Sequence, residues 1–153
     1  MRLKHLLIEH SPYFVTTNIA NAYPLFTDDT NARIVVTALL YLRQRGDFDL
    51  YSYVIMPDHL HLLLLPRQEK SVSEMMHSIK SFTAKEINKH MNRSGKVWQE
   101  DYYEHAVRGK ADFDEKLIYI HNNPVKAGLV KTAEDYKYSS AYKEAYVDAY
   151  PYT

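Results

Sequence analysis

The feature that most constrains the fold is an apolar run over residues 60–65, which is interrupted only by His61 and is followed by Pro66. A short run that is apolar on both faces is typical of a central strand covered on both sides. Residues 48–55 predict a second strand. The residues between them, 56–58, favour a turn, because Pro57 cannot donate to a sheet ladder. We therefore expect an antiparallel hairpin in the middle of a sheet.

Two more strands and three helices are predicted around this hairpin. Residues 12–19 and 96–107 are rich in β-branched and aromatic residues, which favours strands. Apolar residues spaced by three and four predict the helices, and capping and stop signals set their bounds. The first helix begins near Thr30 after Asp28 or Asp29 and stops at Gly46, the second runs over 74–92 after Ser73, and the third runs from a cap at Asp112 to about Asn122, where Pro124 stops it.

The resulting order, β-α-β-β-α-β-α, predicts an α+β fold. It is that of a ferredoxin-like or RRM-like antiparallel sheet with the helices packed on one face. A chain of 153 residues fits one core, so we expect a single domain over 1–153, with an irregular, tyrosine-rich tail from about residue 132. This fold hosts many activities, so function must be argued from the site.

Composition excludes several classes of protein. Cysteine is absent, which removes disulfides, thiol nucleophiles and cysteine-ligated zinc. No apolar run reaches the roughly 18 residues of a membrane span, and we expect a cytoplasmic protein. The formal net charge is zero. That is low for a nucleic-acid-binding domain, so any such role must rest on local basic surfaces.

Two histidines separated by one residue interrupt the central apolar strand. Side chains at i and i+2 on a strand share a face, so His59 and His61 point the same way and Leu60 points into a core. Two adjacent imidazoles can share one divalent cation. The alternative is a pair of structural histidines, satisfied by carbonyl groups or water.

A tyrosine and an asparagine lie one turn apart on the third predicted helix. Phe113, Leu117 and Ile120 form its apolar stripe, while Tyr119 and Asn123 share a neighbouring face. A phenol with a pKa near 10 is a nucleophile only with assistance, and an amide oxygen can bind a hard metal. In a chain with 14 tyrosines, packing is the commoner role for any one of them.

Four ordered segments change this weighting, and together they resemble the single-tyrosine HUH transposases of the bacterial insertion-sequence type. Residues 119–130 are most similar to the REP-associated tyrosine transposases. The segments are residues 56–66 (MPDHLHLLLLP), 119–130 (YIHNNPVKAGLV), 97–108 (VWQEDYYEHAVR) and 13–18 (YFVTTN). The resemblance covers roughly residues 10–140.

The resemblance implies a role for each site residue. His59 and His61 match the HUH histidines, Tyr119 matches the nucleophile, and Asn123 matches the position that completes the metal site. The implied activity is cleavage and rejoining of single-stranded DNA beside hairpins, with Mg²⁺ or Mn²⁺ and a 5′-phosphotyrosine intermediate. Relatives act as a monomer or as a homodimer, and the sequence leaves this choice open.

Contacts to DNA are expected from basic and aromatic side chains. Lys85, Lys89, Arg93 and Lys96 step by four, four and three, which predicts one basic stripe on the second helix. A solvated helix face is the alternative. Arg108 is a further candidate, and looser ones are Arg2, Lys4, Lys126 and Lys131. Trp98, Tyr102 and Tyr103 are candidates for stacking on bases, although core packing is the expected role of Trp98.

Three other functions remain open at the level of sequence. One is a non-catalytic single-stranded nucleic-acid-binding module that retains the RRM-like fold. Another is a metal-dependent hydrolase in which water attacks in place of tyrosine, and the third is a small-molecule enzyme of the ferredoxin-like class. Comparison of covalent adduct in the wild type and Tyr119→Phe separates the first from a tyrosine transferase, and a 5′ end that carries no protein identifies the second.

Overall fold

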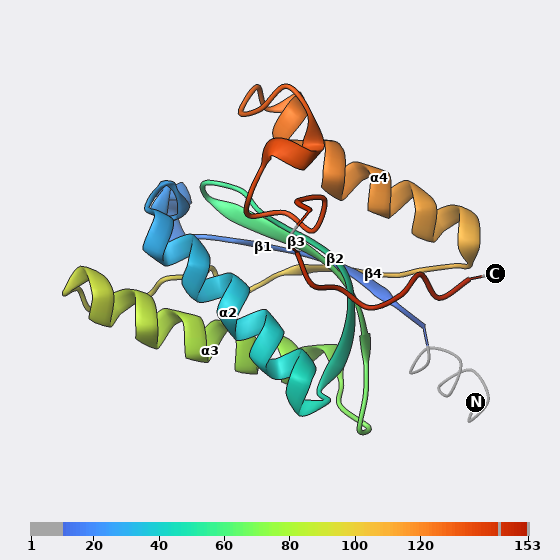
Figure 1. The fold of residues 1–153 in the computed structure, drawn as a ribbon. Coiled ribbons are helices and arrows are strands. Elements are labelled where there is room, and N and C mark those ends of the chain that lie inside the picture. Colours follow the sequence, from blue (N-terminus) through green and yellow to red (C-terminus); the bar gives the residue numbers. More distant parts are fainter. Residues whose placement is uncertain (1–10, 144, 153) are drawn as a thin grey trace.

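The computed structural model describes residues 11–143 and 145–152, which form one antiparallel sheet with helices on both faces (Figure 1). The strands are β1 (Tyr13–Asn18), β2 (Phe48–Ile55), β3 (His59–Pro66) and β4 (Tyr103–Ala106). Their order in the sheet is β2-β3-β1-β4, so β3 and β1 are central. The predicted element order and the ferredoxin-like α+β class are confirmed.

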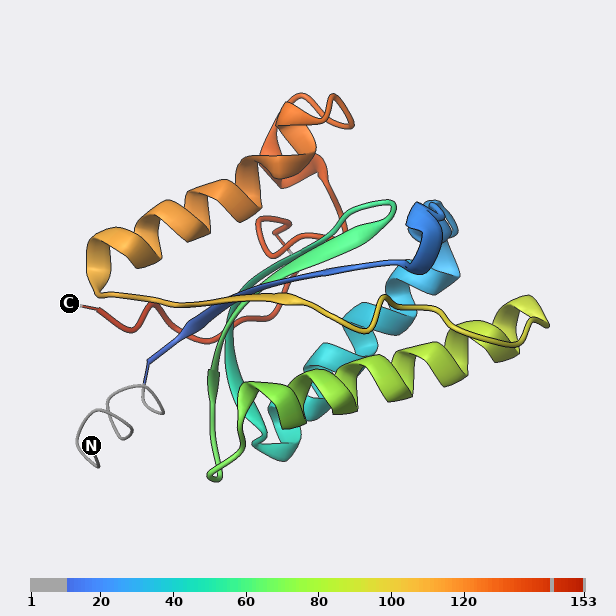
Figure 2. The same cartoon turned by 180° about the vertical axis from the view of Figure 1, so that it is seen from behind.

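The helices are α2 (Asp29–Arg45), α3 (Val72–Met91) and α4 (Lys110–Lys126). Two short 3₁₀ turns, η1 (Ala20–Ala22) and η2 (Leu25–Thr27), lie between β1 and α2, and a third, η3 (Ala133–Asp135), follows α4. Figures 1 and 2 show α2 and α3 side by side on one face of the sheet and α4 on the other. The prediction that the helices pack on one face is therefore wrong for α4.

Two separate cores explain why α4 crosses to the opposite face. Leu60, Leu62 and Leu64 of β3 belong to the core beneath α2 and α3. Leu63 instead packs with Phe113 of α4 in a second core. Because side chains alternate along a strand, the doubly apolar run of β3 presents two faces to be buried. If all the helices lay on one side of the sheet, one apolar face of β3 would be exposed to water.

The start of α3 and the length of β4 differ from those predicted. Ser71 rather than Ser73 caps α3, because Ser71 and Glu74 form a reciprocal capping box. Strand β4 is only four residues long. Ahead of it, the chain pairs just beyond the end of β1 through an isolated bridge between Trp98 and Ile19, and Lys80 Nζ donates to the carbonyl oxygens of Gln99 and Glu100, at 2.5 and 3.0 Å.

Helix α4 does not stop before Pro124 but continues to Lys126. Pro124 is buried within the helix, and its missing N–H removes only one backbone hydrogen bond near the end of the helix. The backbone N–H of Ala127 still donates to the Asn123 carbonyl oxygen at 3.0 Å. Asp112 is not the N-cap residue. It lies in the first turn, where its carboxylate accepts from the Arg108 backbone N–H at 2.8 Å.

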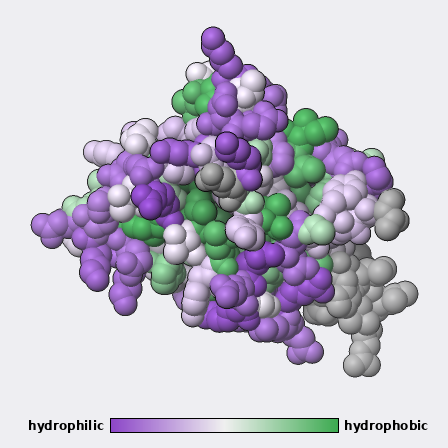
Figure 3. Space-filling view, in the orientation of Figure 1, coloured by the Kyte–Doolittle hydropathy of each residue, from purple (hydrophilic) through white to green (hydrophobic). Residues whose placement is uncertain are grey.

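The chain after α4 is mostly irregular, as predicted, and is hydrogen-bonded to β2. Tyr136 donates its hydroxyl to the Ile55 carbonyl oxygen at 2.6 Å, and Asp148 accepts from both Arg43 and the Leu50 backbone N–H. The face seen in Figure 3 is mostly hydrophilic, with small hydrophobic groups near its centre. No helix within the described residues is long and apolar enough to span a membrane.

Candidate active site

The two histidines of β3 lie next to each other on the face of the sheet that α4 covers. Their ring centroids are 4.9 Å apart. Leu60 between them is fully buried in the opposite core, so the alternation expected of a strand is present. His61 is 4% exposed, whereas His59 is partly exposed. The pair therefore reaches solvent on the side of His59.

Each histidine of the pair has a hydrogen-bond partner for its Nδ1 atom. His61 Nδ1 is 2.7 Å from the Thr16 hydroxyl on β1, and His59 Nδ1 is 2.7 Å from a carboxylate oxygen of Asp58. His61 Nε2 is buried and has no hydrogen-bond partner among the described residues. A buried nitrogen without a partner is costly, and a hydrogen bond to the other ring nitrogen is usual for a metal-ligating histidine.

The histidine pair needs a further ligand to form a metal site. Within the described residues, no group of three or more His, Cys, Asp or Glu side chains could hold a metal ion. Beyond the two imidazole nitrogens, the remaining metal ligands therefore have to be an amide oxygen, water or the phosphate of a substrate. This donor set leaves open positions, as in catalytic rather than structural metal sites.

Burial and the nearby charge of His59 lower the pKa of His61 from 6.5 to about 3. The cause is the loss of water around the charged form, which the second imidazole reinforces. His61 therefore stays neutral at ordinary pH, as a metal ligand must be.

The lowered pKa of His61 predicts a pH-dependent stability. Below pH 6.5 the unfolded chain protonates this histidine, whereas the folded chain does so only near pH 3. The free energy of unfolding should therefore fall as the pH drops through this window, by at most about 1.4 kcal/mol per pH unit from this group. Urea unfolding at several pH values, with a chelator present, should give a free energy of unfolding that depends less on pH in His61→Leu than in the wild type. The exposed-histidine control His77→Gln should follow the wild type. A wild-type slope in His61→Leu would contradict the assignment.

Tyr119 of α4 lies against the buried histidine. Its ring centroid is 5.2 Å from that of His61 and 5.8 Å from that of Phe14, with an edge-on orientation to both. Phe14 in turn stacks on His61 at 5.5 Å. Tyr119 is nevertheless 44% exposed, and its hydroxyl makes no hydrogen bond to a described residue. The ring therefore packs on one side and is open to solvent on the other.

The direction of α4 sets the position of Asn123. The helix begins near the end of the sheet where Tyr13 pairs with Ala106, and Tyr119 contacts His61 further along. Asn123 follows one turn later, and its side chain is partly exposed. Because α4 remains helical through Pro124, Tyr119 and Asn123 keep the one-turn spacing predicted from sequence.

Two hydrogen-bonded clusters that sequence reasoning did not assemble hold α4 on the sheet. His121 Nε2 lies 3.2 Å from the Ser52 hydroxyl of β2 and 2.8 Å from the Ser140 hydroxyl after α4. Burial lowers the pKa of His121, which keeps the imidazole neutral. At the start of the helix, Asp112 accepts from His105 and Lys116 at 2.7 and 2.9 Å. The partners of His121 lie 69 and 19 residues away in the sequence, so local spacing gave no signal for that cluster.

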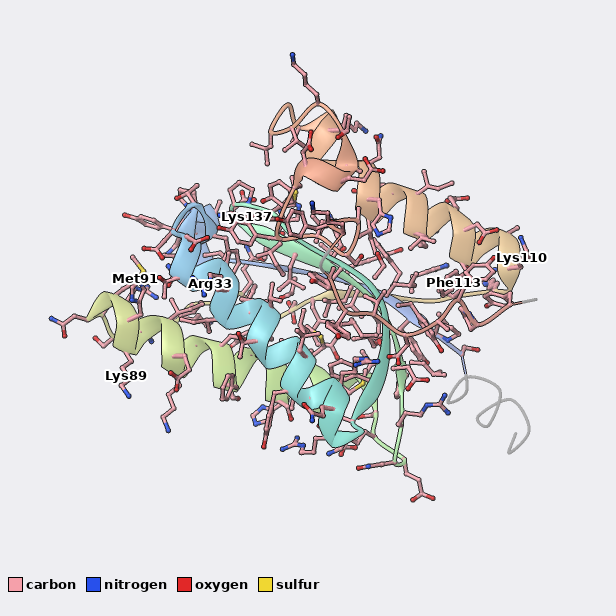
Figure 4. All side chains as sticks on the ribbon, viewed as in Figure 1. Arg33, Lys89, Met91, Lys110, Phe113 and Lys137 are labelled. Carbon is pink, nitrogen blue, oxygen red and sulfur yellow. The ribbon has the colours of Figure 1, made fainter. Side chains whose placement is uncertain are left out.

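The predicted basic stripe is divided by the end of α3. Lys85 and Lys89 lie on the helix, but Asn92 is left-handed and ends it, so Arg93 and Lys96 belong to the following segment. Figure 4 shows Lys89 pointing outward from α3, away from α4. Arg93 and Lys96 line an open hollow together with Asn21 of η1. The idea of one continuous stripe on a helix is therefore wrong.

The remaining basic candidates are dispersed. Arg108 is exposed at the start of α4, three turns before Tyr119. Lys126 and Lys131 are exposed at and beyond the end of α4. Arg2 and Lys4 lie outside the described residues. Within residues 11–143, Arg108 lies before α4, whereas Lys126 and Lys131 lie at or beyond its far end.

Comparison with known proteins identifies the family. Residues 10–123 match the family described as "Transposase IS200 like". The chain belongs to this family. The prediction of a DNA transposase is thereby confirmed.

The relatives agree with the family. A REP-associated tyrosine transposase from Escherichia coli K12 is 27% identical over 146 residues, which cover 94% of this chain and 84% of the relative. A Haemophilus influenzae protein, provisionally given the same name, is 30% identical over 114 residues, covering 68% and 65% of the two chains. The solved structure of a REP-associated tyrosine transposase bound to a REP hairpin has 27% identity and a TM-score of 0.71, with 86% of this chain and 76% of that one covered.

Proposed function

We propose that this transposase cleaves and rejoins single-stranded DNA beside a hairpin through a covalent bond between DNA and Tyr119. The observation that supports the proposal best is the contact between the partly exposed Tyr119 ring and His61, whose buried Nε2 has no partner among the described residues. A nucleophile and a ligand atom without a partner meet here on one face of the sheet. The hairpin is inferred from the relative that was solved with one.

In the proposed reaction, the Tyr119 hydroxyl attacks the scissile phosphorus in line with the leaving 3′ oxygen. A bond forms between the tyrosine oxygen and phosphorus, and the bond to the 3′ oxygen breaks. The phenolic proton passes to solvent, and the leaving 3′ oxygen takes up a proton from solvent. The products are a 5′-phosphotyrosine and a free 3′-hydroxyl. Because the phosphodiester energy is conserved in the covalent bond, a second 3′-hydroxyl can reverse the step without a nucleotide cofactor.

The donor set fits a divalent metal, either Mg²⁺ or Mn²⁺. His59 and His61 would ligate it through Nε2 and Asn123 through its amide oxygen. When bound, such an ion supplies positive charge that polarises and orients the scissile phosphate. Imidazole ligands suit Mn²⁺ better than Mg²⁺, so tighter binding of Mn²⁺ is expected even if Mg²⁺ is the working ion.

The DNA backbone is proposed to contact Lys85, Lys89, Arg93, Lys96 and Arg108. Among these, Arg93 and Lys96 have the best support. The segment after them hydrogen-bonds to Asn18, and Asn18 pairs with His59 at the end of β1. Because these side chains would neutralise only a few phosphates, the affinity for DNA should depend only weakly on the salt concentration. Whether the protein acts as a monomer or a homodimer stays a prediction.

The decisive experiment is cleavage of hairpin-bearing single-stranded oligonucleotides in Mg²⁺ and in Mn²⁺. A tyrosine transferase yields a protein–DNA adduct that survives denaturing electrophoresis and disappears after protease treatment. A metal-dependent hydrolase, in which water attacks, yields a free 5′-phosphate from the earliest times. Finding only the free 5′-phosphate would refute the proposed intermediate.

The hydrogen bond from β1 to His61 predicts a smaller effect on metal binding. Thr16→Val removes the hydroxyl that lies 2.7 Å from His61 Nδ1, so the imidazole loses the partner that fixes its orientation. Loss of such a partner typically weakens metal affinity about 10- to 100-fold. Titration with Mn²⁺ should show this weakening for Thr16→Val, whereas Thr132→Val, on the exposed segment after α4, should bind as the wild type does. Unchanged affinity in Thr16→Val would count against His61 as a ligand.

A further inference from the structure

The three aromatic side chains of residues 97–108 have different environments in the fold. Trp98 is 4% exposed, and its indole N–H donates to the Thr83 hydroxyl at 2.9 Å, so it is part of the core. Tyr102 is partly buried against that same core, with Lys80 Nζ 5.6 Å from its ring centroid. Tyr103 is 57% exposed, and its hydroxyl makes no hydrogen bond to any described residue. Only Tyr103 offers a free ring face.

Tyr103 lies on the same face of the sheet as the histidine pair. It pairs with Thr16 of β1, and Thr16 pairs on its other side with His61 of β3. Paired residues on adjacent antiparallel strands project to the same face. Tyr103, Thr16 and His61 therefore follow one another across the sheet, from the edge strand β4 to the site.

Phe14 connects Tyr103 to the proposed nucleophile. Its ring centroid lies 6.2 Å from that of Tyr103 and 5.8 Å from that of Tyr119, with an edge-on geometry in both contacts. Phe14 itself is only 6% exposed, so it supports its two neighbours rather than offering a surface. The three rings form a row in which both end members are open to solvent.

Helix α4 leaves Tyr103 uncovered. It meets β4 at its start, where Asp112 accepts from His105, and further along it packs against β2, where Phe113 lies edge-on to Tyr51. Strand β4 pairs only with β1 within the described residues, so Tyr103 stands at an open edge. The ring of Tyr103 is therefore accessible to a flat ligand such as a nucleic-acid base.

We propose that Tyr103 stacks on an unpaired base of the single-stranded DNA close to the phosphate that Tyr119 attacks. This inference rests on the proposed function, whose reactive tyrosine lies on the other side of Phe14. Aromatic rings on an open sheet face stack on splayed bases irrespective of sequence, since every base has a π-face. A base held there would fix the register of the strand, so that one phosphate rather than its neighbours meets Tyr119.

The test uses full-length protein carrying Tyr119→Phe, so that DNA is bound but not cut. The probe is a hairpin oligonucleotide with a single-stranded thymidine flank, in which one 2-aminopurine replaces successive flank bases. The fluorescence of this adenine analogue reports stacking. At one flank position we expect quenching that disappears with Tyr103→Ala, and a Kd for the whole probe that rises by roughly 5- to 150-fold. Tyr103→Phe should retain both, because stacking needs the ring and not the hydroxyl.

A matched control separates this site from a general loss of aromatic surface. Tyr146 is 69% exposed in the tail beside β2, at the opposite edge of the sheet from Tyr103, and Tyr146→Ala should change neither signal. Wild-type affinity and quenching in Tyr103→Ala would overturn the proposal. Equal losses in Tyr103→Phe and Tyr103→Ala would also overturn it, because they would indicate a hydrogen bond from the hydroxyl.

Failure of this proposal is distinguishable from failure of the proposed function. With Tyr119 intact, adduct formation measures the nucleophile, whereas quenching in the Tyr119→Phe background measures the stacked base. Adduct that forms equally in wild type and Tyr103→Ala, at the same KM and the same cleavage position, refutes stacking alone. A Tyr103-dependent quench without any adduct refutes the nucleophile alone.

Discussion

Tyr119→Phe is expected to abolish the covalent protein–DNA adduct and to slow strand cleavage by at least about a thousand-fold. Removing a nucleophile eliminates the interaction on which the chemical step depends, and losses of this size or larger are typical. The substitution deletes one oxygen, while the ring contacts to His61 and Phe14 remain possible. The measurement is denaturing electrophoresis of a labelled hairpin oligonucleotide after incubation with metal.

The structure provides controls that make the Tyr119→Phe result specific. The Tyr119 ring is 44% exposed, and Tyr41 on α2 is 54% exposed but lies on the other side of the sheet. Tyr41→Phe should therefore form adduct at the wild-type rate. The DNA affinity and thermal midpoint of Tyr119→Phe should stay near the wild-type values, since its hydroxyl hydrogen-bonds no described residue. Equal adduct in wild type and Tyr119→Phe would eliminate Tyr119 as the nucleophile.

The geometry of the histidine pair was predictable from sequence because it depends on local periodicity. Alternation along a strand fixes His59 and His61 on one face whatever the rest of the fold does. The i, i+4 relation of Tyr119 and Asn123 is local in the same way. Residue types alone did not distinguish Tyr119 from other tyrosines, and it was the resemblance of ordered segments that singled it out.

The position of α4 was not predictable from its own sequence, although β3 contained the information. Any amphipathic helix can cover either face of a sheet, so the stripe of Phe113, Leu117 and Ile120 does not identify its partner. The doubly apolar β3 required a cover on each face. With α2 and α3 on one side, only α4 remained to bury Leu63 and Phe14. Combining these two observations would have predicted the observed arrangement.

Long-range partners account for the rest of what sequence reasoning missed. Thr16 reaches His61 across 45 residues, and Ser140 reaches His121 across 19. Such pairs depend on strand register and on the path of the chain after α4, which no local pattern encodes. The predicted basic stripe failed for a related reason, because the left-handed Asn92 ends α3 before Arg93.

Loss of either histidine of the pair is expected to weaken metal binding by more than about 100-fold. Removing only a hydrogen-bond partner of a ligand already costs about 10- to 100-fold, and deletion of the ligand itself removes a direct bond to the ion. His59→Ala is the safer variant for folding, because His59 is partly exposed whereas His61 is 4% exposed. Mn²⁺ binding, followed by its electron paramagnetic resonance signal without DNA, measures the effect independently of cleavage.

Metal binding and cleavage should be lost together in these variants if the pair holds the ion that supports the reaction. Chelation with EDTA should stop adduct formation by the wild type, and added Mg²⁺ or Mn²⁺ should restore it. In His59→Ala, Mn²⁺ should restore activity only at concentrations raised in proportion to the loss of affinity. His77→Ala, which removes an exposed histidine of α3, should behave as the wild type. Full Mn²⁺ affinity in both His59→Ala and His61→Ala would mean that the buried Nε2 of His61 is unpaired for another reason, and the metal assignment would be wrong.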